Sequence, residues 1–313
     1  MKVFLTGATG FIGSAIIPEL INAGHQVLGL TRSDAGANAL TAAGVEVHRG
    51  SLDDLGSLRS GASQADGVIH CAYNNDLSKL EKTSRAESQA IEALGAGLLG
   101  SDRPLVISSV AAMGAAAPGQ LAVEEYYNPN TPNPRKATEI AGAAAAQRGV
   151  NVSVVRLSQV HSTVKMGFAS QLLRVAREKG VSAYVGDGTS RWAAVHVLDT
   201  AHLYRLVLEK GGPGVRYNAV AEEGIAVREI VEVIGAGLKV PVVSLSPEEA
   251  KSHFGWLAMF VGMDMSASSL RTQQQMSWQP TGPRLIHDLE QSLLSQEGRT
   301  RSGRERSSHV RSH

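Results

Sequence analysis

A glycine-rich turn near the beginning of the chain constrains the fold more than any other feature. Residues 6–13 read TGATGFIG and lie between a run that predicts a strand and a run that predicts a helix. In this order Gly7 permits a tight turn, Gly10 lets a phosphate approach the backbone, and Gly13 lets the helix pack closely on the strand. The free N–H groups at the start of the helix attract an anion. The segment therefore predicts a dinucleotide-binding turn, with cofactor contacts from Gly7, Thr9, Gly10, Phe11, Ile12 and Gly13.

Short apolar runs alternate with helical patterns through the first half of the chain. The apolar runs are almost unbroken, which is typical of strands covered by helices on both faces of a sheet. The alternation predicts an α/β fold of the Rossmann type, with a doubly wound parallel sheet and right-handed crossovers. The predicted strands are Lys2–Thr6, Gln26–Leu30, Val45–His48, Gly67–Ala72, Leu105–Ser109 and Asn151–Leu157, and the clearest helices are Phe11–Asn22, Leu77–Leu99 and Arg135–Gln147.

The pattern loosens after residue 157, where we expect a smaller, mostly helical C-terminal substrate lobe. We therefore divide the chain into a dinucleotide-binding domain over residues 1–157, a lobe interleaved with it over 158–295, and a disordered tail over 296–313. The tail carries five arginines and almost no apolar residues. Within the lobe the predicted helices are Phe168–Lys179, Leu198–Glu209, Val227–Ile234 and Pro247–Phe254, and the predicted strands are Val215–Asn218 and Val240–Ser244.

Composition excludes several classes of function. The formal net charge is +1, so no general basic field favours nucleic acid as a partner. No apolar run reaches the roughly 18 residues of a membrane span, and glycines break the apolar run at the N-terminus that a signal peptide would need. With one cysteine and no HExxH, CxxC or Walker sequence, the chain favours neither a metal site nor ATP use. We expect a cytoplasmic protein with a small-molecule substrate, and a homodimer is left open.

The end of the second predicted strand bears on which dinucleotide is bound. An NAD site usually places an acidic side chain there to hold the ribose 2′-hydroxyl. This chain has Arg32 and Ser33 instead, which would pair with a 2′-phosphate. Asp34 follows and could still hold a ribose. NADP is therefore the expected cofactor, with NAD as the alternative.

Several segments resemble the short-chain dehydrogenase/reductase superfamily in its extended form, the NAD-dependent epimerase/dehydratase family, over about residues 1–290. The resemblance rests on TGATGFIG, GSL at 50–52, VIHCA at 68–72, ISSV at 107–110, and RW with HVLD at 191–199. It implies contacts of Ser51 and Leu52 with adenine and of Cys71 and Ala72 with the cofactor. It also implies an active-site role for Ser109 and a place near the substrate for Arg191 and His196.

The family's Tyr-x-x-x-Lys pair, which performs the proton chemistry, has no counterpart here, because no tyrosine is followed four residues later by lysine. If Lys136 fills the place of the lysine, Pro132 fills that of the tyrosine. Atypical members carry His-x-x-x-Arg, and in that register this chain offers Thr131 and Arg135. Arginine stays protonated, so Arg135 could hold an anion, polarise a carbonyl or bind ribose. The candidates for the missing acid are Tyr73, Tyr126, Tyr127, His161 and His196.

Two functions stay open on this sequence. The first is an NAD(P)-dependent oxidoreductase or epimerase/dehydratase-like enzyme that acts on a carbonyl or hydroxyl group, with Ser109, Thr131 and Arg135 in catalysis. The second is a non-catalytic NADP-binding sensor. The missing tyrosine favours the sensor, whereas the serine and the substrate-side segment favour the enzyme. The residues expected to face the substrate are Tyr73, His161, Arg191 and His196.

Overall fold

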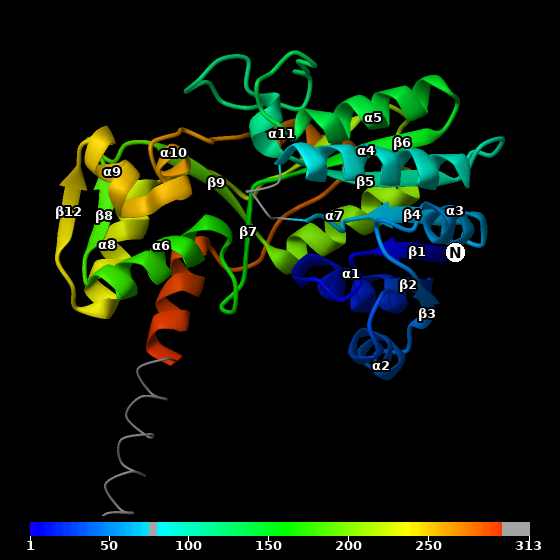
Figure 1. Ribbon diagram of the computed structural model, residues 1–313, viewed down its shortest axis with the longest axis horizontal. Coiled ribbons are helices and arrows are strands. Elements are labelled where there is room, and N and C mark those ends of the chain that lie inside the picture. Colours follow the sequence, from blue (N-terminus) through cyan, green and yellow to red (C-terminus); the bar gives the residue numbers. More distant parts are fainter. Residues whose placement is uncertain (75–79, 296–313) are drawn as a thin grey trace, which may run out of the picture.

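A seven-stranded parallel sheet forms the centre of the protein (Figure 1). The structure is a computed structural model that describes residues 1–74 and 80–295. The strand order is β10-β6-β5-β4-β1-β2-β3, so the chain starts in the middle of the sheet and winds outward in both directions. The strands are β1 (Lys2–Thr6), β2 (Gln26–Thr31), β3 (Glu46–Arg49), β4 (Gly67–His70), β5 (Pro104–Val110), β6 (Asn151–Leu157) and β10 (Arg216–Ala219).

Helices cover both faces of this sheet because successive side chains of each strand point to opposite faces. Val3 and Leu5 of β1 belong to one buried cluster, which also contains Ile16 of α1 and Leu206 of α7. Phe4, between them, belongs to a second cluster on the other face. The helices around the sheet are α1 (Phe11–Asn22), α2 (Asp34–Ala42), α3 (Leu55–Ser63), α4 (Leu80–Ala96), α5 (Lys136–Gln147) and α7 (Val197–Lys210).

A second lobe lies beyond the carboxyl ends of the strands (Figure 1). Two small sheets support it, with strand orders β11-β9-β7 and β12-β8. Its strands are β7 (Gln159–His161), β8 (Ser182–Val185), β9 (Arg191–His196), β11 (Glu222–Ala226) and β12 (Val242–Leu245). Its helices are α6 (Gly167–Lys179), α8 (Val227–Leu238), α9 (Pro247–Phe254), α10 (Ala258–Val261) and a last helix over residues 285–295. The helix α11 (Leu270–Met276) packs instead on α7 and β10, beside the main sheet.

The predicted Rossmann-type fold is confirmed, including the bounds of β1, α1 and β6. The lobe is interleaved with the sheet, because β10 pairs with β6 and α7 packs beside α1. The predicted start of the helix at Leu77 falls in 75–79, outside the described residues, and so does the expected tail over 296–313. No helix in the described part of the chain is long and apolar enough to cross a membrane.

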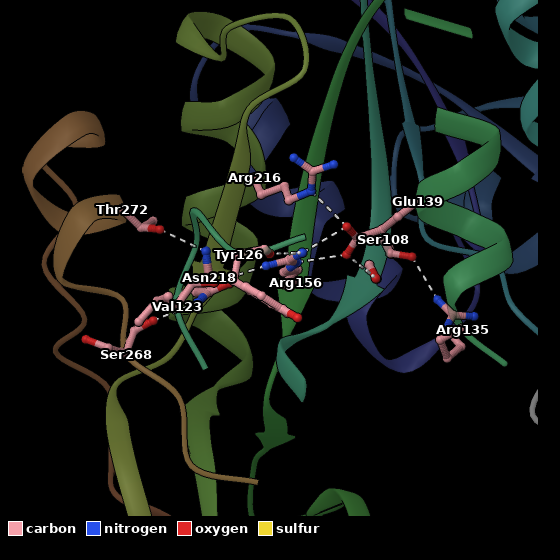
Figure 2. Close-up of polar contacts among 11 residues, drawn as sticks. Ser108, Val123, Tyr126, Arg135, Glu139, Arg156, Arg216, Asn218, Ser268 and Thr272 are labelled. Carbon is pink, nitrogen blue, oxygen red and sulfur yellow. Dashed lines mark hydrogen bonds and ion pairs between the residues drawn. The ribbon is translucent and has the colours of Figure 1, made fainter. Parts of the chain in front are cut away.

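A buried ion network ties β6, β10 and α5 together at the carboxyl end of the sheet (Figure 2). The carboxylate of Glu139 on α5 accepts hydrogen bonds from Arg156 Nε and Nη2, at 2.8 and 2.9 Å, and from Arg216 Nε at 2.8 Å. Arg156 is completely buried and also donates to the carbonyl groups of Val123 and Tyr126. Burial raises the pKa of Glu139, but Arg156 and Arg216 outweigh this effect and hold the pKa below its ordinary value of 4.5.

We expect Glu139→Gln to destabilise the fold by about 3–5 kcal/mol, because Arg156 would keep a buried charge without its carboxylate. Urea unfolding at neutral pH measures the change in the free energy of unfolding. Since the pKa of Glu139 is lowered by folding, its contribution is present above pH 4.5 and is lost as the pH falls below that value. The control is Glu92→Gln, which breaks an exposed pair with Arg148 and should cost less than about 1 kcal/mol. Equal losses in the two variants would contradict the assignment.

Candidate active site

The glycine-rich turn lies against the first residues after β4. Gly7 has a φ of 72°, and a Cβ at this position would lie 2.7 Å from the backbone nitrogen of Ala72. A Cβ at Gly13 would overlap the carbonyl oxygen of Gly7. Glycine is therefore required at both positions for the turn to pack between β1, β4 and α1.

The start of α1 presents its backbone N–H groups without a side-chain cap. Gly10 is the N-cap residue, no side chain caps the helix, and the first turn contains no acidic residue. Thr9 and Gly10 are exposed, while Phe11 and Ile12 are half-buried against the core. This arrangement favours an anion at the helix start, as the sequence predicts.

The residue that follows β2 is a cation, Arg32. Arg32 is exposed and makes no ion pair or hydrogen bond with any residue in the ranges 1–74 and 80–295. Asp34 is held by an ion pair with Arg49, at the end of β3. The hydroxyl group of Ser33 caps α2 by accepting from the backbone nitrogen of Gly36. Ser51 and Leu52 follow β3 as half-buried residues.

The residues that follow β4 lie against the glycine-rich turn. Cys71 donates from Sγ to the carbonyl oxygen of Thr6 at 3.1 Å, and burial raises the pKa of this thiol to about 12. The thiol therefore stays protonated and is not a nucleophile at neutral pH. The backbone nitrogen of Ala72 donates to Thr6 Oγ1 at 3.4 Å. Tyr73 comes next and is half-buried.

Arg135, just before α5, joins two of these strand ends. Its Nη2 donates to the carbonyl oxygen of Ser108 at 2.8 Å, as Figure 2 shows, and its guanidinium lies over the ring of Tyr73, 3.6 Å from the ring centroid. Its Nε and Nη1 are buried and have no hydrogen-bond partner in the described part of the chain. Buried donors normally find an acceptor, so these two groups make Arg135 a candidate ligand-binding residue.

Ser109 and Thr131 are placed differently from Arg135. Ser109 is completely buried, and its hydroxyl group donates to Glu139 at 2.9 Å. It would have to leave the ion network to reach a substrate. Thr131 is half-buried and accepts from the backbone nitrogen of Asn133. The catalytic role of both residues stays a prediction.

Two of the residues predicted to face the substrate, His161 and His196, lie together around Asp288 of the last helix. His161 Nδ1 lies 2.7 Å from Asp288 Oδ2, and His196 Nε2 lies 3.8 Å from the same oxygen. Burial lowers the pKa of His161, although Asp288 opposes this effect. Arg191 is exposed and pairs with Asp264 at 2.9 Å. The structure thus brings His161 and His196 together but does not join them to Arg135 through any described contact.

Sequence reasoning missed a buried carboxylate close to Arg135. Glu87 on α4 is 4% exposed, lies 3.4 Å from His70 Nε2, and accepts from Thr138 Oγ1 at 3.3 Å. Burial raises the pKa of Glu87, but the charges of His70 and Arg135 outweigh it and leave the pKa below the ordinary value. A signal was present, because Glu87 shares the helix face of the buried residues Ala90, Ile91 and Leu94.

Comparison with known proteins places this site in a family. A profile of the NAD dependent epimerase/dehydratase family matches residues 3–219. The chain belongs to this family. An uncharacterized protein of Schizosaccharomyces pombe is 44% identical over 290 residues, which cover 92% of this chain and 98% of that protein. A UDP-glucose 4-epimerase of Streptomyces lividans is 27% identical over 316 residues, which cover 90% of this chain and 92% of that enzyme.

The fold agrees with that of a solved dehydratase. The dTDP-glucose 4,6-dehydratase of Streptomyces venezuelae, solved with NAD bound, superposes with a TM-score of 0.74. The two chains are 17% identical, and the superposition covers 94% of this chain and 96% of the other. The resemblance predicted from the glycine turn and the strand ends is therefore confirmed.

We expect Gly10→Val to weaken the binding of a nicotinamide dinucleotide by at least about tenfold, or 1.4 kcal/mol. The branched side chain would stand over the exposed N–H groups at the start of α1. Calorimetric titration with NADPH measures the affinity. Gly56→Val is the control, because Gly56 is exposed at the start of α3 and its added Cβ meets nothing closer than 3.4 Å. Unchanged binding by a folded Gly10→Val protein would exclude a phosphate at this turn.

Proposed function

We propose that the protein is an NADP-dependent oxidoreductase that reduces a carbonyl group, or oxidises the corresponding hydroxyl group, of a small molecule. The observation that carries the proposal is the position of Arg135. It stands at the carboxyl edge of the sheet, stacked on Tyr73, with two buried N–H groups that have no partner in the described residues. Ligands of doubly wound sheets bind at this edge.

The residues present fit a nicotinamide dinucleotide. The close approach at Gly7 leaves the start of α1 open for the pyrophosphate, and Cys71 and Ala72 border the same turn. The unpartnered Nε and Nη1 of Arg135 suit the hydroxyl groups of a ribose, which accept hydrogen bonds. The bound NAD in the S. venezuelae dehydratase supports this class of cofactor.

The preference for NADP follows from the charges after β2 and β3. Arg32 is exposed and unpaired in the described structure, so it is free to meet a 2′-phosphate. Asp34 forms an exposed ion pair with Arg49, which reduces its repulsion of a phosphate. Arginine pairs well with phosphate because its planar donors match the phosphate oxygens.

Reduction of a carbonyl requires a hydride and a proton. A reduced nicotinamide supplies the hydride when it is bound, and the residues around Arg135 supply the proton. Tyr73 has a phenol hydroxyl at the strand edge, and this group is the proton donor that we assign. In reduction the carbonyl carbon gains the hydride, and the oxygen takes the phenolic proton. Arg135 places a permanent positive charge 3.6 Å above the ring and so stabilises the negative charge that develops as the proton leaves.

The other predicted residues keep separate roles in this proposal. Arg191 and His196 stay substrate-side candidates, because they lie in the lobe that faces the carboxyl edge. Ser109 could act on the substrate only after its hydrogen bond to Glu139 breaks. We therefore rank it below Tyr73 as a candidate proton donor.

Arg32→Ala should reduce the preference for NADPH over NADH. A charge-assisted hydrogen bond is worth about 1.5–3 kcal/mol, so we expect a loss of roughly ten- to a hundredfold in NADPH affinity. NADH affinity should be nearly unchanged, because NADH has no 2′-phosphate. Titration of both cofactors into both proteins gives the ratio. Equal affinities of the parent protein for the two cofactors would overturn the NADP assignment.

Tyr73→Phe should lower kcat by about 10²–10⁴-fold, the usual contribution of a positioned acid, and leave NADPH affinity intact. Arg135→Ala should reduce both turnover and affinity, and Arg135→Lys should recover part of each. Steady-state turnover of NADPH with a panel of ketones, aldehydes and nucleotide sugars, beside cofactor titration, separates these effects. Ser109→Ala is the matched comparison.

The pattern of losses decides between the candidates. If only Ser109→Ala lowers turnover, Ser109 rather than Tyr73 is the proton donor. Tight NADPH binding without turnover of any compound would favour the sensor function instead.

A further inference from the structure

The loop between β7 and α6 brings a residue of the second lobe to the start of α1. Lys165 lies in this loop, and its Nζ stands over the ring of Phe11, 5.6 Å from the ring centroid. Phe11 is the first residue of α1 and follows Gly10 directly. A cation from the second lobe therefore lies beside the helix start that the first lobe presents.

The backbone of this loop is held in place although Lys165 itself is exposed. The backbone nitrogen of Ser162 donates to the carbonyl oxygen of Lys165 at 2.8 Å, and that of Val164 donates to Ser162 Oγ at 3.2 Å. The backbone nitrogen of Met166 donates to Ser170 Oγ at 2.8 Å, and the Met166 side chain is 2% exposed. The base of the lysine side chain is thus positioned before any ligand arrives, which reduces the entropy lost on binding.

Nothing in the described structure neutralises this cation. Lys165 forms no ion pair with any residue in 1–74 or 80–295, and the first turn of α1 has no acidic residue. The ammonium group thus lies beside the side chain of the first residue of α1, whose start has a positive dipole end and uncapped N–H groups, and no acidic side chain of the described residues pairs with it. An anion between them would satisfy all three.

We propose that Lys165 is a cofactor-binding residue contributed by the second lobe, and that it contacts the pyrophosphate of the dinucleotide. This inference rests on the proposed function, because it requires a dinucleotide on the glycine-rich turn. The pyrophosphate is the expected partner because Lys165 stands at the start of α1. Arg32, at the end of β2, is left to the 2′-phosphate. Lys165 therefore contributes to affinity for NADPH and NADH alike, whereas Arg32 discriminates between them.

A contact of Lys165 with the pyrophosphate would also make the second lobe part of the cofactor site. His161 and Lys165 are separated by one short loop, and His161 is held by Asp288 of the last helix. A dinucleotide held by Lys165 would thus bridge the sheet and the lobe that carries the predicted substrate residues.

The test compares Lys165→Met and Lys165→Arg with the parent protein. Methionine is an unbranched, uncharged side chain only one atom shorter than lysine, so the substitution removes the charge with little change in shape. We expect Lys165→Met to weaken NADPH and NADH by the same factor of about ten, the effect of one phosphate contact, and to reduce the dependence of affinity on salt. Lys165→Arg should restore most of the affinity. Lys251→Met, an exposed lysine on α9, should change neither.

Each other outcome has a definite meaning once circular dichroism shows the variants to be folded. Parental affinities in Lys165→Met would overturn the contact and leave the proposed function intact. A loss for NADPH alone would overturn the assignment to the pyrophosphate. A parent protein that binds neither cofactor would refute the proposed function, and this inference with it.

Discussion

The carboxylate of Glu139 is the contact on which the carboxyl edge of the sheet depends. Its two oxygens accept from Ser109 on β5, from Arg156 on β6 and from Arg216 on β10, and so fasten three neighbouring strands to α5. Because Arg156 is completely buried, its charge requires this partner. The start of α5 is thereby fixed, and with it the backbone of Arg135 four residues earlier.

The candidate site is built where three rigid pieces meet. The glycine-rich turn brings the start of α1 against the residues after β4, and Arg135 reaches the same place from α5. Tyr73 stands between them, under the guanidinium of Arg135. In the proposed function, elements of this kind would hold a cofactor and a proton donor at a fixed separation, as transfer of a hydride and a proton to one carbonyl requires.

Electrostatic balance explains why the site can hold so many cations. The positive charge of Arg135 interacts with the buried carboxylate of Glu87, which His70 and Thr138 also contact. Arg32 and Lys165 are exposed, so water solvates them in the free protein. Arg135 thus has a nearby counter-charge, while under the proposed function the two exposed cations would meet the phosphates of the dinucleotide.

Local patterns in the sequence were enough for the elements of the sheet. The apolar runs at β1 and β6 and the helix after TGATGFIG were predicted with their observed bounds, because hydrophobic periodicity and glycine spacing are local properties. The return of β10 to the sheet was harder to see, since its short strand, Arg216–Ala219, pairs with β6 about sixty residues earlier in the chain.

The sequence by itself determined the dinucleotide-type turn and the family, and it supplied the candidate catalytic residues, which stay predictions. It did so because glycines at a fixed spacing are needed wherever backbone meets phosphate. Only the tertiary structure decided which of these residues contact one another. It turned Ser109 toward Glu139, stacked Arg135 on Tyr73, and brought Lys165 to Phe11 across 154 positions of sequence. Such pairings depend on strand order and on compensation of buried charge, and neither can be read from neighbouring residues.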